Sequence, residues 1–342
     1  MGYSFNISTF NNVLRELSAD YIIYAPVKIF NKGVFSDTDL VTYGQIKTLE
    51  DIEFEEKSHF SSKEIFFPIT QTLFYFTEDA FSLPKISPKK IIIFCRPCDA
   101  NGIQRLDQIF LKNGDLMDNY YNELRKKVHL FVLECKYSFD TCFCVSMGAN
   151  KVDRYSAFIR RAGDTVLCDV SVDFEDRFSK YGTYVNMTPV FIESNDIKVD
   201  IPEKIPKSIF YHKLWDEYSE RCIACGRCNV VCPTCSCFTM QDIFYEDNPY
   251  CGERRRVWAS CMIDGFTDMA GGNSFRKNKG ERMRFRLLHK IHDFKQKFGS
   301  NHHMCVGCGR CSDVCPENIS FTACIQKLNQ AVQSSDQRGL KS

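Results

Sequence analysis

The chain has 342 residues, enough for two domains, and its 44% hydrophobic and 25% charged residues are typical of a folded globular protein and exclude a disordered one. Its 44 basic and 43 acidic residues nearly cancel, so no global field favours nucleic acid or an anionic membrane as a partner. The first residues lack the features of a signal peptide and no apolar run approaches about 18 residues, which predicts a cytoplasmic protein without a membrane span.

Helical and strand patterns alternate over the first 190 residues. Apolar residues at helical spacing predict a helix over residues 10–17, and short apolar runs predict strands at 21–24, 91–94 and 130–133. Alternating residues on both sides of Gly163 and Asp164 predict a β-hairpin. The charged stretch from Glu193 to Lys207 contains two prolines and has the pattern of a linker. We therefore expect an α/β domain over residues 1–205.

The remainder of the chain shows a helical pattern that occurs twice. Helices are predicted at 210–218 and 287–298, and a group of cysteines follows each of them. The second predicted helix stops at Gly299. The pattern predicts an all-α domain over residues 206–330, followed by a flexible polar tail at 331–342.

The two cysteine groups have the same spacing. Cys222-x2-Cys225-x2-Cys228-x3-Cys232-Pro233 recurs 83 positions later as Cys305-x2-Cys308-x2-Cys311-x3-Cys315-Pro316. Each is a complete bacterial ferredoxin motif, in which three close thiolates and a distant fourth hold [4Fe-4S] clusters, so the second domain is expected to be a dicluster ferredoxin-like domain. In two-cluster ferredoxins the fourth cysteine binds the other cluster. The spacing therefore predicts two ligand sets: Cys222, Cys225, Cys228 and Cys315 for one cluster, and Cys305, Cys308, Cys311 and Cys232 for the other.

Two other metal sites compete with this interpretation. Zinc also takes four thiolates, but its sites usually show two separate Cys-x2-Cys pairs without the distal Cys-Pro. The pairs Cys222/Cys228 and Cys311/Cys315 match the Cys-x5-Cys and Cys-x3-Cys spacing of sirohaem sulfite reductases, but this leaves the other cysteines of both runs idle. The ferredoxin interpretation uses all eight.

A second concentration of cysteines lies in the predicted α/β domain. Cys98 and Cys135 each follow an apolar strand by a few residues, and Cys142 and Cys144 come soon after. Strand ends that meet at one edge of a sheet often form a ligand site, so these four predict a third iron–sulfur cluster. The alternative is that they are buried structural cysteines, as we expect of Cys168.

Two further groups leave more than one interpretation open. Cys235, Cys237, Cys251 and Cys261 could form another site, although their spacing is irregular. Seven arginines lie between the two motifs, and they suit a solvated face, a docking surface for an acidic partner, or charges that offset the clusters. They are Arg254, Arg255, Arg256, Arg276, Arg282, Arg284 and Arg286.

No motif for a nucleotide or flavin is present. The sequence lacks a Gly-x-Gly-x-x-Gly after a strand and a phosphate-binding loop, and no nucleophile stands beside an evident base. We predict no catalytic residue in this chain. It has the properties of an electron relay that needs a donor and an acceptor.

The assembled motifs resemble the A subunit of anaerobic sulfite reductase and, more distantly, the β subunit of cytosolic sulfhydrogenases. The resemblance covers most of the chain and rests on both ferredoxin runs together with five shorter segments. These are Arg96-Pro97-Cys98-Asp99, Thr141-Cys142-Phe143-Cys144 with Ser146-Met147-Gly148, Cys232-Pro233-Thr234-Cys235, Trp258 with Ser260-Cys261-Met262, and Ala270-Gly271-Gly272-Asn273-Ser274-Phe275-Arg276.

The resemblance implies a non-catalytic electron-transfer subunit. Its partners would be a flavin subunit that oxidises NADH and a sirohaem subunit that reduces sulfite to sulfide. The alternative is the electron-transfer β subunit of a soluble NiFe (sulf)hydrogenase. A third hypothesis is a free-standing ferredoxin-like or cluster-assembly protein.

Overall fold

The computed structural model describes residues 1–246 and 248–339 and divides them into two compact units. Unit 1 comprises residues 1–137, 150–193 and 239–257, and unit 2 comprises 138–149, 194–238 and the residues from 258 onward. The chain therefore alternates between the units, whereas the sequence pattern predicts one boundary near residue 205.

Unit 1 is built on a mixed eight-stranded sheet in the order β10-β1-β9-β8-β7-β6-β2-β3. The neighbours β2, β6, β7 and β8 are parallel, and the other pairs are antiparallel. Apolar runs form the central strands because both faces of such strands are buried. The strands are β1 (Gly2–Asn6), β2 (Tyr21–Ile29), β3 (Leu40–Gln45), β6 (Lys90–Cys95), β7 (Val128–Leu133), β8 (Ala157–Ala162), β9 (Thr165–Val170) and β10 (Thr183–Tyr184).

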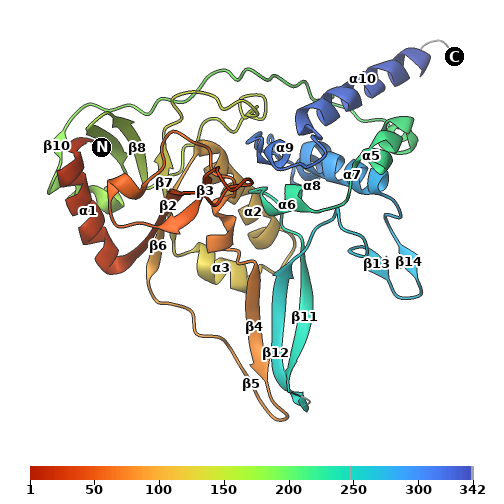
Figure 1. The fold of residues 1–342 in the computed structure, drawn as a ribbon, viewed down its shortest axis with the longest axis horizontal. Coiled ribbons are helices and arrows are strands. Elements are labelled where there is room, and N and C mark those ends of the chain that lie inside the picture. Colours follow the sequence, from red (N-terminus) through yellow and green to blue (C-terminus); the bar gives the residue numbers. More distant parts are fainter. Residues whose placement is uncertain (247, 340–342) are drawn as a thin grey trace. The chain divides into compact units, whose positions relative to one another are not determined.

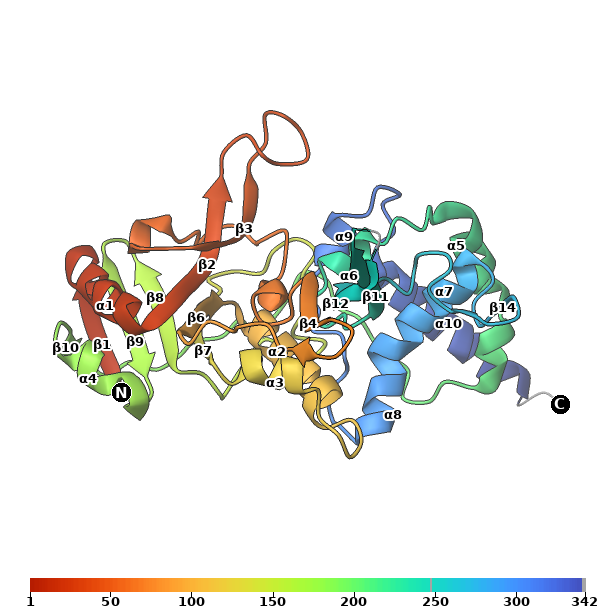
Figure 2. The same cartoon turned by 90° about the horizontal axis from the view of Figure 1, so that it is seen from below.

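Several predicted elements of this unit are confirmed. Strands β8 and β9 form the expected hairpin through Gly163, whose φ of 61° suits glycine. Helix α1 (Ile7–Asp20; Figure 1) is confirmed. It buries Phe10, Val13, Leu14 and Leu17 in the core of the sheet, as their spacing predicts. The other helices are α2 (Pro97–Leu111), α3 (Asn119–Arg125) and α4 (Glu175–Ser179). Figure 2 shows β2 and β3 side by side as a long arm that ends in the loop at residues 30–39.

The expected all-α domain beyond residue 206 is wrong. β11 (Phe238–Tyr245) and β12 (Asn248–Trp258) form a long ribbon that joins β4 (Thr70–Phe76) and β5 (Phe81–Ser82) in a four-stranded sheet, in the order β11-β12-β4-β5 (Figure 1). Strand β12 pairs antiparallel with β4. A segment that lies between the two cysteine motifs in the sequence therefore forms a sheet with strands from the N-terminal part of the chain. A further small ribbon, β13 (Asp268–Met269) with β14 (Asn273–Ser274), follows.

The ribbon also explains part of the arginine group. Arg254 forms two hydrogen bonds with Asp242 across the ribbon. Arg256 is only 1% exposed and lies over the ring of Phe67, 5.0 Å from its centroid, with Asp118 as its ion-pair partner. A solvated face therefore describes Arg254 but not Arg256.

Unit 2 consists largely of short helices around the two cysteine motifs. Helix α7 continues through a π-helical turn, His289–Asp293, into α8, so the predicted helix at 287–298 is the second half of a longer helical segment. Its helices are α5 (Asp216–Arg221), α6 (Arg227–Val230), α7 (Lys279–Leu288), α8 (Phe294–Phe298), α9 (Arg310–Asp313) and α10 (Phe321–Gly339). Helix α10 extends into the predicted tail as far as Gly339, and residues 340–342 lie outside the described residues.

Candidate metal centre

The first cysteine motif begins where α5 ends. Cys222 is the C-cap residue of that helix, and two left-handed residues follow in the loop, Ala224 with φ 56° and Gly226 with φ 75°. The left-handed turn directs the backbone N–H of Ala224 toward the sulfur of Cys222, at 3.3 Å. Such N–H donors stabilise a thiolate that ligates a metal.

The second motif repeats this local geometry. Gly307 and Gly309 have φ of 66° and 74° at the positions equivalent to Ala224 and Gly226. The N–H of Gly307 donates to the sulfur of Cys305 at 3.4 Å. Helices α6 and α9, which follow the two loops, contact each other. The sequence repeat is therefore also a structural repeat, with the two loops close together.

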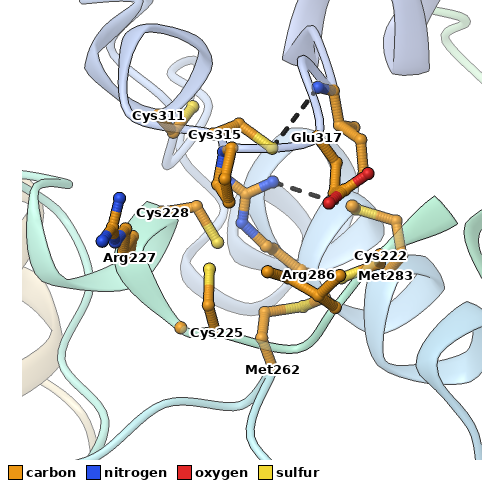
Figure 3. Close-up of a pocket in the computed structure, with 14 residues that line it drawn as sticks. Cys222, Cys225, Arg227, Cys228, Met262, Met283, Arg286, Cys311, Cys315 and Glu317 are labelled. Carbon is orange, nitrogen blue, oxygen red and sulfur yellow. Dashed lines mark hydrogen bonds between the residues drawn. The ribbon is translucent and has the colours of Figure 1, made fainter.

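One pocket gathers thiols from both motifs (Figure 3). Its lining includes Met262, Met283 and the side chain of Arg286. The cysteines in the lining are the whole set predicted for the first cluster, with one more from the second motif: Cys222, Cys225, Cys228, Cys315 and Cys311. Cys225 is exposed, so this pocket reaches the surface.

A second pocket is lined by the set predicted for the other cluster. Phe143, Phe321 and Lys290 contribute to its wall. Its cysteines are Cys305, Cys308, Cys311 and Cys232, of which Cys311 is half-buried and the others are buried. Each pocket thus takes three thiols from one motif and at least one from the other, the arrangement expected for crossed ligation. Which thiol binds which cluster stays a prediction.

The chemistry of these thiols fits a cluster. Burial raises the pKa of the Cys228 thiol to about 12 and also raises that of Cys305. A buried thiolate is therefore costly unless a metal binds it. Among the described residues, no three His, Cys, Asp or Glu side chains are grouped for a single metal ion.

The predicted third cluster divides between the two units. Cys98 lies in the first turn of α2, directly after β6, and Cys135 follows β7, so both stand at the ends of neighbouring parallel strands. Cys142 and Cys144 belong to unit 2. The third cluster stays a prediction. Asp99, beside Cys98, is buried and accepts a hydrogen bond from the hydroxyl of Tyr43 at 3.4 Å.

Sequence reasoning missed that the segment at residues 138–149 packs against the second motif. The N–H of Phe143 donates to the carbonyl of Gly307 at 2.8 Å, and the hydroxyl of Thr141 donates to Asp313 at 2.6 Å. The thiol of Cys142 lies 3.7 Å from the carbonyl oxygen of Cys308. Thr141-Cys142-Phe143-Cys144 was visible in the sequence, but its distance from residue 305 gave no sign of this contact.

The irregular cysteine group is also divided. Cys251 lies on β12 in unit 1, whereas Cys235, Cys237 and Cys261 belong to unit 2. A hydrogen bond from Cys237 lowers the pKa of Cys261, and Asn229 adds a second donor 3.1 Å from its sulfur. Cys168, in unit 1, is fully buried in the sheet core, as expected of a structural cysteine.

Comparison with known proteins agrees with this geometry. Residues 221–319 match the model of the 4Fe-4S dicluster domain, which indicates [4Fe-4S] clusters as the cofactor. The chain is 28% identical over 260 residues to sulfhydrogenase 2 subunit beta of Pyrococcus furiosus, covering 71% of this chain and 75% of that protein. Within the described residues, no helix is long and apolar enough to cross a membrane. The chain is thus similar over most of its length to a sulfhydrogenase β subunit and includes an iron–sulfur domain of the two-cluster type.

Proposed function

We propose that this chain is the electron-transfer subunit of an oxidoreductase complex, relaying single electrons through two [4Fe-4S] clusters held in the two thiol-lined pockets. The observation that carries the proposal is the composition of each pocket: three thiols of one ferredoxin motif and at least one of the other. A bound [4Fe-4S] cluster supplies one-electron redox chemistry, with a potential set by charge, hydrogen bonds and exposure.

The residues of the chain would do three things for this chemistry. The thiolates hold the clusters, and the N–H groups of Ala224 and Gly307 donate to ligand sulfurs. The apolar wall formed by Phe143 and Phe321 excludes water from the second pocket. The exposed Cys225 places the first pocket at the surface, where a redox partner can approach. We therefore expect electrons to enter or leave the chain at the first pocket.

Among candidate complexes, we place a NiFe (sulf)hydrogenase first. The similarity to a sulfhydrogenase β subunit supports it, whereas the anaerobic sulfite reductase suggested by the motifs has no support from the comparisons. Anaerobic purification of the tagged chain from its own cells, with identification of the bound subunits, tests this choice. Hydrogenase subunits are the expected result. A sirohaem subunit with a flavin subunit would instead favour sulfite reduction, and an isolated chain would contradict membership of a complex.

Crossed ligation has its own test in the full chain. Cys232→Ser should alter the same electron paramagnetic resonance signal as Cys305→Ser, because both thiols line the second pocket. Cys222→Ser should alter the other signal. The matched control is Cys235→Ser, a buried cysteine three positions from Cys232 that lines neither pocket. A Cys232→Ser spectrum that matched that of Cys222→Ser would contradict the crossing.

A further inference from the structure

We propose that Arg286 is a shared electrostatic element of the two cluster sites, which raises both reduction potentials together, while Lys290 acts on the second site alone. The inference rests on the proposed function, since it requires clusters in both pockets. It concerns two cations that lie one turn apart on the helical segment formed by α7 and the π-turn.

Arg286 is the cation that lines both pockets. Its side chain is 4% exposed and lies in the wall of the first pocket with Cys228 and Cys315, and in the wall of the second with Cys305 and Cys308. Figure 3 shows its guanidinium between Cys228 and Cys315, and so between the two motifs. Cys311 is the thiol that also borders both pockets. The charge of Arg286 can therefore interact electrostatically with a cluster in either pocket.

Packing fixes the guanidinium in this position. Its carbon lies 4.5 Å from the centroid of the Phe321 ring, an attractive cation–π geometry. One terminal nitrogen lies 3.9 Å from the sulfur of Met283, and Nε has no hydrogen-bond partner among the residues that the structure describes. Neither contact neutralises the charge. An arginine held this way is a fixed positive charge, because guanidinium stays protonated in proteins.

Lys290 differs because it borders the second pocket only. It is 3% exposed, and its ammonium donates to the hydroxyl of Thr234 at 2.8 Å, two residues from Cys232. Burial lowers the pKa of both cations, but the charge of nearby cysteines raises it above the ordinary value, and the cysteines acting on Arg286 come from both motifs. Glu317 is the carboxylate in the wall of the first pocket.

The sign of the effect follows from charge. Reduction adds a negative charge to a cluster, and a nearby fixed cation stabilises the reduced form more than the oxidised form. The effect is large in a buried site, where the dielectric is low and solvent screens little. Burying two positively charged side chains in a protein interior costs free energy, because the charges lose their hydration. Compensation of the charge on the clusters explains why they are here.

The test is redox titration of both clusters in the anaerobically purified full chain, followed by electron paramagnetic resonance. In Arg286→Gln we expect the ratio of reduced to oxidised protein at a fixed potential to fall at least about tenfold for both clusters, a shift of about 59 mV for a one-electron couple. In Lys290→Gln the same fall is expected for one cluster only. Arg286→Lys should restore much of the loss.

Controls separate this role from folding. Arg282→Gln removes a buried arginine one turn away on α7, which pairs with Asp264 and lines neither pocket, and it should leave both potentials in place. If Arg286→Gln does not hold its clusters, Arg286→Met replaces it in the same comparison.

Unchanged potentials in cluster-loaded Arg286→Gln or Arg286→Met would overturn the inference, and a shift in one cluster alone would overturn the shared role. Iron and sulfide analysis of the wild type separates this result from failure of the proposed function. A wild-type chain without [4Fe-4S] clusters would refute the proposed function, whereas loaded clusters with unmoved potentials refute only the role of Arg286.

Discussion

Alanine at Gly309 and at Gly226 should have different effects, although the two glycines occupy equivalent places in the two motifs. Their φ angles are nearly equal, 74° and 75°. A Cβ atom on Gly309 would lie 2.3 Å from the backbone oxygen of Thr141. On Gly226 the nearest atom would be Cδ1 of Ile263, at 3.0 Å, and this side chain is free to change its rotamer. Backbone strain is thus common to both variants, and a backbone clash is specific to Gly309→Ala.

The structure gives the size of this difference. A left-handed alanine costs about 1–2 kcal/mol at either position. Overpacking against backbone adds about 1–3 kcal/mol at Gly309. A shift of the Thr141 segment to relieve the clash would disturb its bonds to Asp313 and Gly307, each worth about 0.5–1.5 kcal/mol. We therefore expect Gly309→Ala to be less stable than Gly226→Ala by about 1–3 kcal/mol.

Loss of cluster absorbance at a fixed elevated temperature, under anaerobic conditions, is the appropriate assay, because proteins with bound metal rarely unfold reversibly. Each ~1.4 kcal/mol in the barrier to loss changes its half-life about tenfold. The half-life of Gly309→Ala should be shorter than that of Gly226→Ala by about fivefold or more, provided the clash is relieved in the transition state. Equal half-lives would refute the packing of residues 138–149 against the second motif.

Three more predictions concern other parts of the chain. Asp118→Ala removes the ion-pair partner of the buried Arg256 and the N-cap of α3, so it should lower stability by about 2–4 kcal/mol, measured as a fall in the thermal midpoint against Asp115→Ala. The hydrogen bond from Arg255 lowers the pKa of Glu253 to about 2, so the stability advantage of wild type over Glu253→Gln should be constant above about pH 5 and shrink as the pH falls from about 4.5 toward 2. The double variant Cys142→Ser/Cys144→Ser should lose about four irons per chain if the third cluster exists, and unchanged iron content would return these cysteines to a structural role.

Elements with one dominant local signal were predictable from the sequence. The apolar run Ile91–Phe94 predicts a buried strand by itself, wherever in the sequence its partner strands lie. Gly163 with Asp164 likewise predicts a tight hairpin without information from the rest of the chain. The two cysteine motifs are equally local, since the spacing within each loop sets the left-handed turns that aim its thiols. In each case the information lies within a few residues.

The β-ribbon could not be predicted in the same way. Between Arg254 and Arg256 the chain carries three consecutive charges, a pattern typical of an exposed segment. They fit a strand because Asp242 and Asp118 supply partners from β11 and from the residue before α3. These partners are distant in sequence, so no local pattern distinguishes the ribbon from a solvated loop.

A long segment separates the two cysteine motifs in the sequence. Between them the chain leaves unit 2, forms most of β11 and most of β12 in unit 1, and returns to unit 2 at Trp258. A longer loop raises the entropic cost of loop closure only slightly, since each doubling of loop length costs only about 0.6 kcal/mol. Each pocket is lined by thiols of both motifs. With the crossed ligation that we predict, neither motif would complete its site alone. Crossed ligation would therefore make the two clusters and the fold of unit 2 depend on one another, with Arg286 and Cys311 at the border that the two sites share.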